Sequence, residues 1–378
     1  MNQRLTHLRS FFQEKKLDGI LIASSVQIAY LTGYHGFSLV EREAYLLVTK
    51  TQPFLITDAR YTEEVRKACP KITILERNAK TPTSRHIEKI CKEQQIERLG
   101  FEPDSITITE YKQFKFNKFT LVPYSLHALR IQKNEEEIAA IQKACQIGDE
   151  TFTYIQTQIA EDITEKELAK RMELFIREKD ATLSFETIVA FGKNAAIPHH
   201  HTDDTRLTTG NTILLDFGVK YENYCSDMTR TIFFKSITDK QKKIYETVKK
   251  AQEKAIEYVN QELRILHQEK PKTNDQRLTT DMRPLLTSNI DKAARSYILD
   301  NNFPSIPHGL GHGIGLEVHE APHLSPLSKE HLTEGMVFSI EPGIYFPHQG
   351  STRIEDLFTI QHNKLQQLTK SSKEILII

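Results

Sequence analysis

The sequence predicts an α/β (α+β) protein built from two domains. Its 378 residues are more than twice the ~150 residues of an ordinary domain. Strand-like and helix-like segments alternate through roughly the first 125 residues, which is typical of an α/β unit with a partly parallel sheet. A new helix begins close to residues 128–134. We therefore expect one domain over 1–130 and a second over 131–378.

The first domain shows the alternation segment by segment. Its opening helix carries Leu5, Leu8 and Phe12 at steps of three and four, the spacing of one apolar helix face. Short apolar runs predict strands at 18–23, 43–48 and 53–56. Helical patterns follow at 61–68 and 83–96.

Helices are also expected in the second domain: one that begins after Asn134, and others over 164–179, 239–266 and 291–299. Asn134 fits an N-cap because glutamates follow it in the first turn, where the helix dipole favours acidic side chains. Thr164 and Glu167 have the spacing of a capping box. Residues 267–284 are polar, contain Pro271 and lack periodicity, so a loop or insertion is expected there.

Charge and composition exclude several classes of protein. Fifty basic and 50 acidic residues balance to a net charge of zero, which argues against general nucleic-acid binding. No apolar run approaches the ~20 residues that span a bilayer. Met1 to His7 lack the apolar region of a secretory signal, so we expect a cytoplasmic protein without membrane association. Free thiols in a reducing compartment are expected for the cysteines, which lack C-x-x-C spacing: Cys69, Cys91, Cys145 and Cys225.

Two apolar strands, 211–219 and 224–234, each carry one carboxylate, Asp216 and Asp227. A hairpin centred on Tyr221–Glu222 would place the two carboxylates directly opposite, with Cβ atoms about 4.5–5.5 Å apart. Carboxylates this close repel each other unless a proton or a cation lies between them. In the alternative, one of the two aspartates is a turn or surface residue. That alternative does not explain why the two aspartates would face each other across the hairpin.

The segment 308–320 carries His308, His312 and His319 among four alternating glycines. A zinc-binding helix does not fit, because each glycine costs a helix about 1 kcal/mol and the glutamate of H-E-x-x-H is missing. A nucleotide loop G-x-G-x-x-G would need glycine where Ile314 stands. Alternating glycines instead suit an extended backbone packed closely against a neighbour. A single histidine here could be a core residue, but three together favour a ligand or acid–base role.

Two further carboxylates follow, Glu341 at the end of a strand-like run and Glu355 inside another. A buried glutamate is costly without a partner. With Asp216, Asp227 and His312 they form a set of four hard oxygen ligands and one nitrogen ligand. This chemistry suits two adjacent divalent cations such as Mn, Co, Fe or Zn.

In their order and flanking residues, these five positions resemble the dinuclear site of the pita-bread metallopeptidases, which include methionine aminopeptidase, prolidase and Xaa-Pro aminopeptidase. Family-like segments lie at 194–199, 215–218, 226–231, 308–320, 340–343 and 353–356. The first half resembles the creatinase/prolidase N-terminal domain, most clearly at 18–23, 29–34 and 55–61. Methionine aminopeptidases lack that domain, so the resemblance, which covers nearly the whole chain, favours the Xaa-Pro branch.

The resemblance implies a metal-dependent exopeptidase that acts on proline-containing peptides as an Xaa-Pro aminopeptidase, or alternatively as an Xaa-Pro dipeptidase (prolidase). It implies two divalent metal ions, Mn first and Co, Zn or Fe as alternatives. Asp216 would chelate one ion, Asp227 and Glu355 would bridge both, and His312 and Glu341 would complete the other. A homodimer is also implied.

The same resemblance assigns catalytic roles. Glu341 would shuttle a proton, and His199, His308 and His319 would line the pocket, where they could bind the substrate carbonyl or stabilise the tetrahedral intermediate. Arg353 would orient the carboxylate of a ligand or of the substrate; a structural ion pair is the equal alternative.

The sequence departs from the family in places. Family members commonly have glycine after the first pocket histidine, whereas here His199 is followed by His200 and His201. We expect these two to be solvated loop residues, with a third metal contact as the alternative. The segment 267–284 is longer than in typical relatives but carries no ligand of the family pattern.

Two alternative functions would use different chemistry. A creatinase-like hydrolase shares the fold without using all five ligands, and a non-catalytic pita-bread binding protein has no reason to keep both acidic pairs. The sequence leaves open the preferred metal and the choice between dipeptidase and aminopeptidase.

Overall fold

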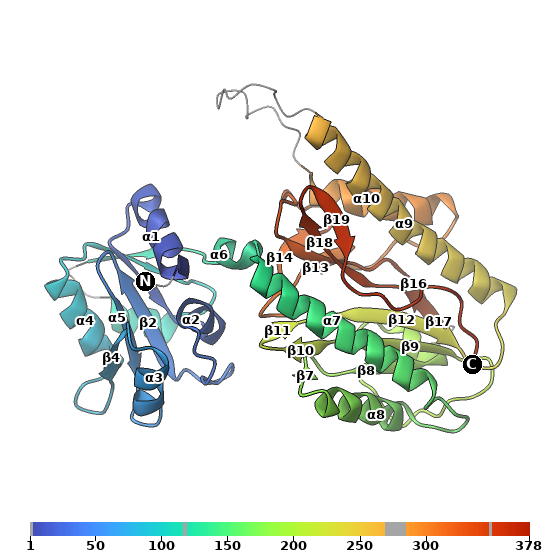
Figure 1. Ribbon diagram of the computed structural model, residues 1–378, viewed down its shortest axis with the longest axis horizontal. Coiled ribbons are helices and arrows are strands. Elements are labelled where there is room, and N and C mark those ends of the chain that lie inside the picture. The colour runs from blue at the N-terminus through green and yellow to red at the C-terminus, as the bar shows by residue number, and fades with distance from the viewer. Residues whose placement is uncertain (1–2, 116–118, 269–284, 348–349) are drawn as a thin grey trace. The chain divides into compact units, whose positions relative to one another are not determined.

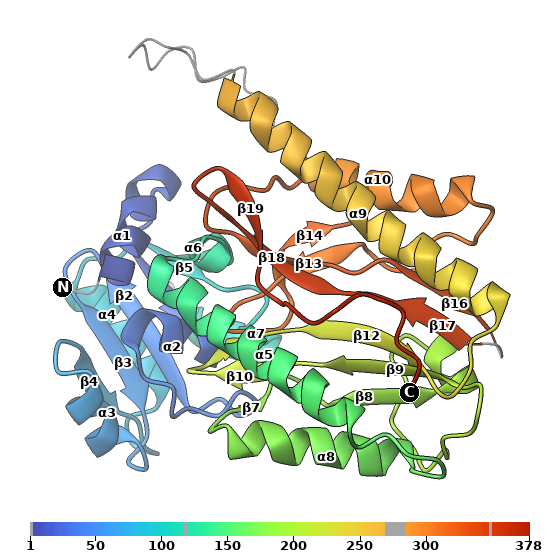
Figure 2. The same cartoon turned by 45° about the vertical axis from the view of Figure 1, so that its right-hand side comes forward.

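The computed structural model describes residues 3–115, 119–268, 285–347 and 350–378 (Figure 1; Figure 2). The chain divides into two compact units, Met1–Arg130 and Ile131–Ile378. In the described ranges, no helix is both long enough and apolar enough to cross a membrane. The loop or insertion predicted over 267–284 lies almost entirely outside the described residues; its first two residues end a helix.

The first unit is a mixed sheet with helices between its strands. Its helices are α1 (Gln3–Lys15), α2 (Ser25–Thr32), α3 (Thr62–Ala68), α4 (Thr83–Glu93), α5 (Ile108–Phe114) and the short α6 (Ala128–Ile131) that reaches its end. Its strands are β1 (Gly19–Ile22), β2 (Ala44–Thr49), β3 (Pro53–Thr57), β4 (Thr73–Glu76), β5 (Arg98–Phe101) and β6 (Thr120–Pro123). They pair in the order β4-β3-β2-β1-β5-β6.

This sheet confirms the predicted partly parallel α/β unit. The pairs β3–β4, β1–β5 and β5–β6 are parallel, and β1–β2 and β2–β3 are antiparallel. The opening helix buries the predicted face of Leu5, Leu8 and Phe12. The central strands β1, β2 and β3 are buried at every position, as expected of strands covered on both faces.

The second unit has two halves, each a pair of helices packed against strands that form two sheets. The first half holds α7 (Glu135–Gln156), α8 (Glu165–Glu178), β7 (Thr182–Leu183), β8 (Ile188–Phe191), η1 (Gly192–Ala196), β9 (Thr212–Phe217), β10 (Val219–Tyr221), β11 (Tyr224–Cys225) and β12 (Met228–Phe233). The second half holds α9 (Asp239–Gln268), α10 (Thr287–Asp300), β13 (Gly311–Gly313), β14 (Glu320–Leu324), β15 (Val337–Ile340), β16 (Gly343–Phe346), β17 (Gly350–Arg353), β18 (Asp356–Gln361) and β19 (Lys364–Gln367).

Each half has its own apolar core between helices and strands. In the first, Met172 of α8 belongs to one cluster with Leu215 of β9 and Ile232 of β12. In the second, Val248 of α9 belongs to one cluster with Phe338 of β15. Because successive strand residues point to opposite faces, Asp216, next to Leu215, lies on the face of β9 away from that core. Helix α8 thus packs on the face of β9 that carries Leu215, and Asp216 lies on the opposite face.

Two predicted helix starts in this unit, after Asn134 and at Thr164, are confirmed, whereas the helix expected over 291–299 begins four residues earlier, at Thr287. Asn134 accepts a hydrogen bond from the backbone of Glu137, whose carboxylate accepts one from the backbone of Asn134, which completes a capping box. Thr164 and Glu167 form the second capping box. Each box satisfies donors that the first helical turn leaves open.

Candidate metal centre

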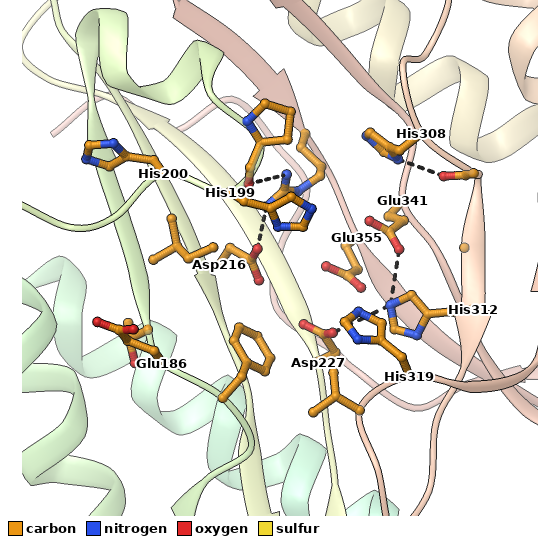
Figure 3. Close-up of a pocket in the computed structure, with 18 of the residues that line it drawn as sticks. Glu186, His199, His200, Asp216, Asp227, His308, His312, His319, Glu341 and Glu355 are labelled. Atoms are coloured by element: carbon orange, nitrogen blue, oxygen red, sulfur yellow. Dashed lines mark hydrogen bonds and ion pairs between the residues drawn. The ribbon is translucent and has the colours of Figure 1, made fainter. Parts of the chain in front are cut away.

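A pocket of about 650 Å³ opens in the second unit and is lined by residues of both halves (Figure 3). Among the lining residues are all those predicted from the sequence for metal binding or catalysis: Asp216, Asp227, His312, Glu341, Glu355, His199, His308, His319 and Arg353. The fold therefore collects residues up to 156 positions apart, such as His199 and Glu355, in one cavity.

The two aspartates are offset along the sheet, which corrects the predicted register. Asp216 of β9 pairs with Thr229 of β12, so Asp227 lies two positions further along, in the gap between β11 and β12. The turn is centred on Glu222 and Asn223, which both have positive φ, as a two-residue hairpin turn of type I′ requires. An offset of two keeps the aspartates on the same face, so both still reach the pocket.

The other three predicted ligands come from the second half. His312 is the central residue of β13, and Glu341 directly follows β15, as predicted. Glu355 was expected inside a strand, but it lies in the break between β17 and β18. There its backbone NH donates to the carbonyl of Thr229, which joins it to the first half.

The alternating glycines let β13 approach β15 closely, as expected from the sequence. A Cβ atom added to Gly311 would lie 2.1 Å from the carbonyl oxygen of Ser339, a distance that no side chain tolerates. The Ser339 hydroxyl also accepts a hydrogen bond from the backbone of His312 and donates one to Glu341. Ser339 thus ties these two predicted ligands together.

Donor atoms of three predicted ligands lie within 4.8 Å of one another: those of Asp227, His312 and Glu355. His312 Nε2 is 3.8 Å from Asp227 Oδ2 and 3.3 Å from Glu341 Oε1. Among the described residues, Asp227 Oδ1 and Glu355 Oε1 are buried without any hydrogen-bond partner. Burial raises the pKa of both carboxyls, and the neighbouring acids raise it further.

This arrangement fits divalent cations. Buried carboxylate oxygens without donors are costly, whereas a cation placed among them supplies the missing charge and ligand bonds. Four carboxylates with one imidazole form a donor set suited to Mn, Fe, Co or Zn rather than to a purely thiolate-binding metal. The chemistry of the site therefore agrees with the metal chemistry predicted from the sequence.

His312 and Glu341 form a charge pair at one side of the cluster. Burial alone would raise the pKa of Glu341, but the hydrogen bond and charge of His312 outweigh it and lower this pKa to about 2. Burial likewise opposes the charged form of His312, yet Glu341 raises its pKa to about 9. The imidazolium form of His312 and the carboxylate form of Glu341 therefore stabilise each other.

Arg353 binds a predicted ligand. Its Nη2 forms an ion pair with Asp216, its Nε donates to the hydroxyl of Thr229 over 3.0 Å, and its Nη1 donates to the Tyr345 hydroxyl over 3.1 Å. The guanidinium is buried in this network. The carboxylate that Arg353 contacts is that of Asp216, a predicted ligand.

The three predicted pocket histidines surround this centre. His319 packs edge-on against His312 at 4.4 Å between ring centroids. His308 shares a hydrogen bond of 2.9 Å with the Tyr345 hydroxyl. Partial burial lowers the pKa of His308, and desolvation in the pocket together with the charge of His312 lowers that of the more exposed His319, which favours neutral imidazoles in both. Figure 3 places His199 beside Asp216.

The prediction for His200 was wrong, while His201 is exposed as expected. His200 Nε2 lies 2.7 Å from Glu165 Oε2, and the side chains are 7% and 0% exposed. Glu165 also accepts hydrogen bonds from the backbone of Phe191, the backbone of Asp203 and the side chain of Asn194. His200 therefore anchors the segment that carries His199, rather than being solvated.

Sequence reasoning missed two polar residues of the site. The Thr229 hydroxyl donates to Glu355 Oε2 over 2.7 Å, and the Tyr345 hydroxyl lies between His308 and Arg353. Thr229 follows Asp227 at a spacing of two on the same strand path, a signal that could have indicated it. Tyr345 has no comparable signal in the sequence.

Comparison with known proteins covers the whole chain. The pattern of metallopeptidase family M24 matches residues 139–269 and 276–362, and the creatinase/prolidase N-terminal domain matches residues 4–131. The Xaa-Pro dipeptidase of Pyrococcus furiosus is 33% identical over 383 residues, which span 100% of each chain.

Solved structures agree with these matches. An Xaa-Pro dipeptidase from Bacillus anthracis is similar with a TM-score of 0.86 at 33% identity, over 100% of this chain and 99% of that one. An X-Pro aminopeptidase from Thermotoga maritima MSB8 gives 0.80 at 28% identity, over 96% and 98%. The predicted fold, a creatinase/prolidase-like domain followed by a pita-bread domain, is confirmed. The chain belongs to metallopeptidase family M24 and is a metal-dependent hydrolase.

Proposed function

We propose that this peptidase is an exopeptidase that hydrolyses the bond between an N-terminal residue and proline, with two divalent metal ions at its centre. The main support for this proposal is a pair of buried carboxylate oxygens, Asp227 Oδ1 and Glu355 Oε1. Both lack a hydrogen-bond partner among the described residues, and both residues line the same pocket. Two such atoms in one cavity are what bridging ligands require.

The proposed ligands are the five residues predicted from the sequence: Asp216, Asp227, His312, Glu341 and Glu355. Asp227 and Glu355 would bridge, Asp216 would serve one ion, and His312 with Glu341 the other. Divalent ions held by these residues would supply Lewis acidity and a water of lowered pKa. Mn is the first candidate, and Co, Zn and Fe suit the same donor set.

The protein's own side chains would then handle protons and orientation. Glu341, next to His312, would accept the proton of the attacking water and deliver it to the proline nitrogen as the peptide bond breaks. The neutral His319 would donate a hydrogen bond to the substrate carbonyl oxygen, and His199 would act beside it. His308 would line the pocket, because its Nδ1 donates to the carbonyl of Gly309 and its Nε2 is paired with the Tyr345 hydroxyl. Arg353 would hold Asp216 in place through their ion pair.

Both forms of Xaa-Pro exopeptidase remain within the proposal. The relatives named Xaa-Pro dipeptidase are 33% identical, whereas the structure named X-Pro aminopeptidase is 28% identical. This supports the dipeptidase form for the present chain, although the sequence led first to the aminopeptidase form. The rival binding-protein function is disfavoured because it gives no reason to bury unpaired carboxylates.

The partner and location also stay predictions. The homodimer rests on the resemblance alone. All four cysteines are buried and free, which agrees with a reducing compartment such as the cytoplasm.

One assay tests the proposed function. Protein stripped of metal and reloaded with Mn or Co would receive Gly-Pro-type dipeptides and Xaa-Pro-Yaa peptides side by side. Cleavage of dipeptides only identifies an Xaa-Pro dipeptidase, and cleavage of the longer peptides an Xaa-Pro aminopeptidase. Turnover of neither substrate by metal-loaded protein would contradict the proposal.

A further inference from the structure

Gln252 is a fully buried carboxamide in the middle of helix α9. Its Nε2 donates to the carbonyl of Ile340 over 2.9 Å and lies 3.4 Å from the carbonyl of Ile354. It also lies 3.1 Å from Asp356 Oδ2. One side chain therefore contacts two segments of the second half that are distant in sequence.

The acceptors of Gln252 adjoin the proposed metal ligands. Ile340 directly precedes Glu341, and Ile354 directly precedes Glu355, while Asp356 directly follows it. Glu341 directly follows β15 and Glu355 directly precedes β18, and the two glutamates share no ladder hydrogen bond of their own, since the β15–β18 pairing ends with the pair Ile340 and Asp356. Gln252 thus links the backbones of these segments directly beside the two proposed ligands.

Both the nitrogen and the oxygen of the Gln252 carboxamide form hydrogen bonds. Its Oε1 accepts a hydrogen bond of 2.9 Å from Lys373 Nζ, which also lies 2.8 Å from Asp356 Oδ2. The other oxygen of Asp356 accepts from Arg230 at 2.6 Å and from Thr369 at 2.7 Å. Because the Lys373 ammonium can only donate, Oε1 must face it and Nε2 must face the carbonyls, so the carboxamide has one orientation. Its contacts join Lys373, Asp356 and the two backbone segments in one polar network.

A role in simple core packing does not explain this residue. On the same face of α9, Val248, Ala251, Ala255 and Val259 are apolar and buried. Burying a polar side chain costs free energy unless hydrogen bonds inside the protein replace those it made with water. The contacts of Gln252 give it a function that an apolar residue of the same size lacks.

We propose that Gln252 is a positioning residue that sets the separation of the Glu341 and Glu355 carboxylates and so the affinity of the centre for its second divalent ion. This inference rests on the proposed dinuclear function. Groups that orient metal ligands typically change metal affinity or activity 10- to 100-fold when they are removed.

The test compares Gln252→Met with Gln241→Met. Methionine nearly matches the volume of glutamine but donates no hydrogen bond. Gln241 lies on the same helix, and its Nε2 reaches Gly210 and Thr212 at 3.3 Å, away from the pocket lining. For chelator-stripped proteins, calorimetry with MnCl₂ gives the dissociation constant of each ion, and denaturant unfolding gives the stability of the same samples.

We expect Gln252→Met to weaken the second ion about 10- to 100-fold and to leave Gln241→Met within about twofold of the unchanged protein. A side chain that served only stability would lower the unfolding midpoint without changing ion affinity in the folded fraction. Ion affinities of Gln252→Met within twofold of the unchanged protein would overturn the inference. Should Gln252→Met fail to fold, Gln252→Asn, whose amide is one methylene too short to reach both carbonyls, must show the same weakening.

Different results would overturn the proposed dinuclear function and the proposed role of Gln252. If the unchanged protein takes up no divalent ion, both the dinuclear function and the role of Gln252 are overturned. If it takes up two ions and the Gln252 variants do the same with equal affinity, only the role of Gln252 is overturned.

Discussion

The hydroxyl of Thr229 donates to Oε2 of Glu355 over 2.7 Å, while Oε1 of the same carboxylate has no partner among the described residues. The two oxygens of Glu355 therefore differ: one is fixed by the first half of the unit and the other is left for the pocket. Arg353 Nε donates to the same hydroxyl, so Thr229 also connects Glu355 with the guanidinium that binds Asp216.

Replacing Thr229 by valine should loosen Glu355. The variant keeps the β-branched shape but loses the hydroxyl that donates to Oε2, so we expect Mn affinity or kcat to fall about 10- to 100-fold. Thr359→Val is the matched control, because Thr359 is equally buried and its hydroxyl has no partner among the described residues. Equal metal affinity and kcat in the two variants would contradict a role for Thr229.

Replacing His319 by alanine should separate catalysis from metal binding. His319 contacts His312 through its ring but is not a proposed ligand, so metal content should persist while kcat falls about 100-fold or more. Metal analysis and steady-state kinetics on the same samples measure both. His331→Ala, at an exposed position outside the pocket lining, is the control. An unchanged kcat in His319→Ala would remove this residue from the pocket chemistry.

Two adjacent histidines should differ sharply in their effect on stability. His200→Ala removes the buried partner of Glu165 and should lower the free energy of unfolding by about 1–3 kcal/mol. His201→Ala, one position further along at an exposed site, should change it by less than about 0.5 kcal/mol. Denaturant titrations of both variants decide this. Equal destabilisation would show that the contact with Glu165 contributes nothing specific.

The four cysteine thiols should not react with disulfide reagents while the protein is folded. Burial raises the pKa of Cys91 to about 12 and that of Cys225 to about 11, and it raises those of Cys69 and Cys145 as well. Because these values lie above pH 8, the thiols stay protonated there, and the thiolate is the reactive form. A disulfide reagent such as DTNB should therefore react at pH 8 only after guanidinium is added. A thiol that reacts rapidly before unfolding would contradict the burial.

Much of the fold follows from local sequence signals. The capping boxes at Asn134 and Thr164 depend on residues three positions apart, so the sequence alone located both helix starts. The aspartate register was missed by two positions because the strand pattern is compatible with either turn. Positive φ at Glu222 and Asn223 decides the register, and Asn223 was the available signal.

The sequence predicted which residues form the site, but not which residues hold them in place. Asp216, His312 and Glu355 stood out because charged residues interrupt apolar or glycine-rich runs. The burial of His200 could not be predicted, since it depends on Glu165, 35 positions away, and an irregular segment has no periodicity to indicate which side chain points inward. The roles of Thr229 and Gln252 likewise depend on tertiary contacts.

The central claim is that the five residues hold two divalent ions, and a calorimetric titration of chelator-stripped protein with MnCl₂ tests it most directly. We predict two Mn ions per chain for the unchanged protein and loss of tight binding in Asp227→Asn. The variant should remain folded and, without metal, gain roughly 1–2 kcal/mol of stability as the repulsion of Glu355 is relieved. Fewer than two ions in the unchanged protein, or two tightly bound ions in Asp227→Asn, would contradict the account.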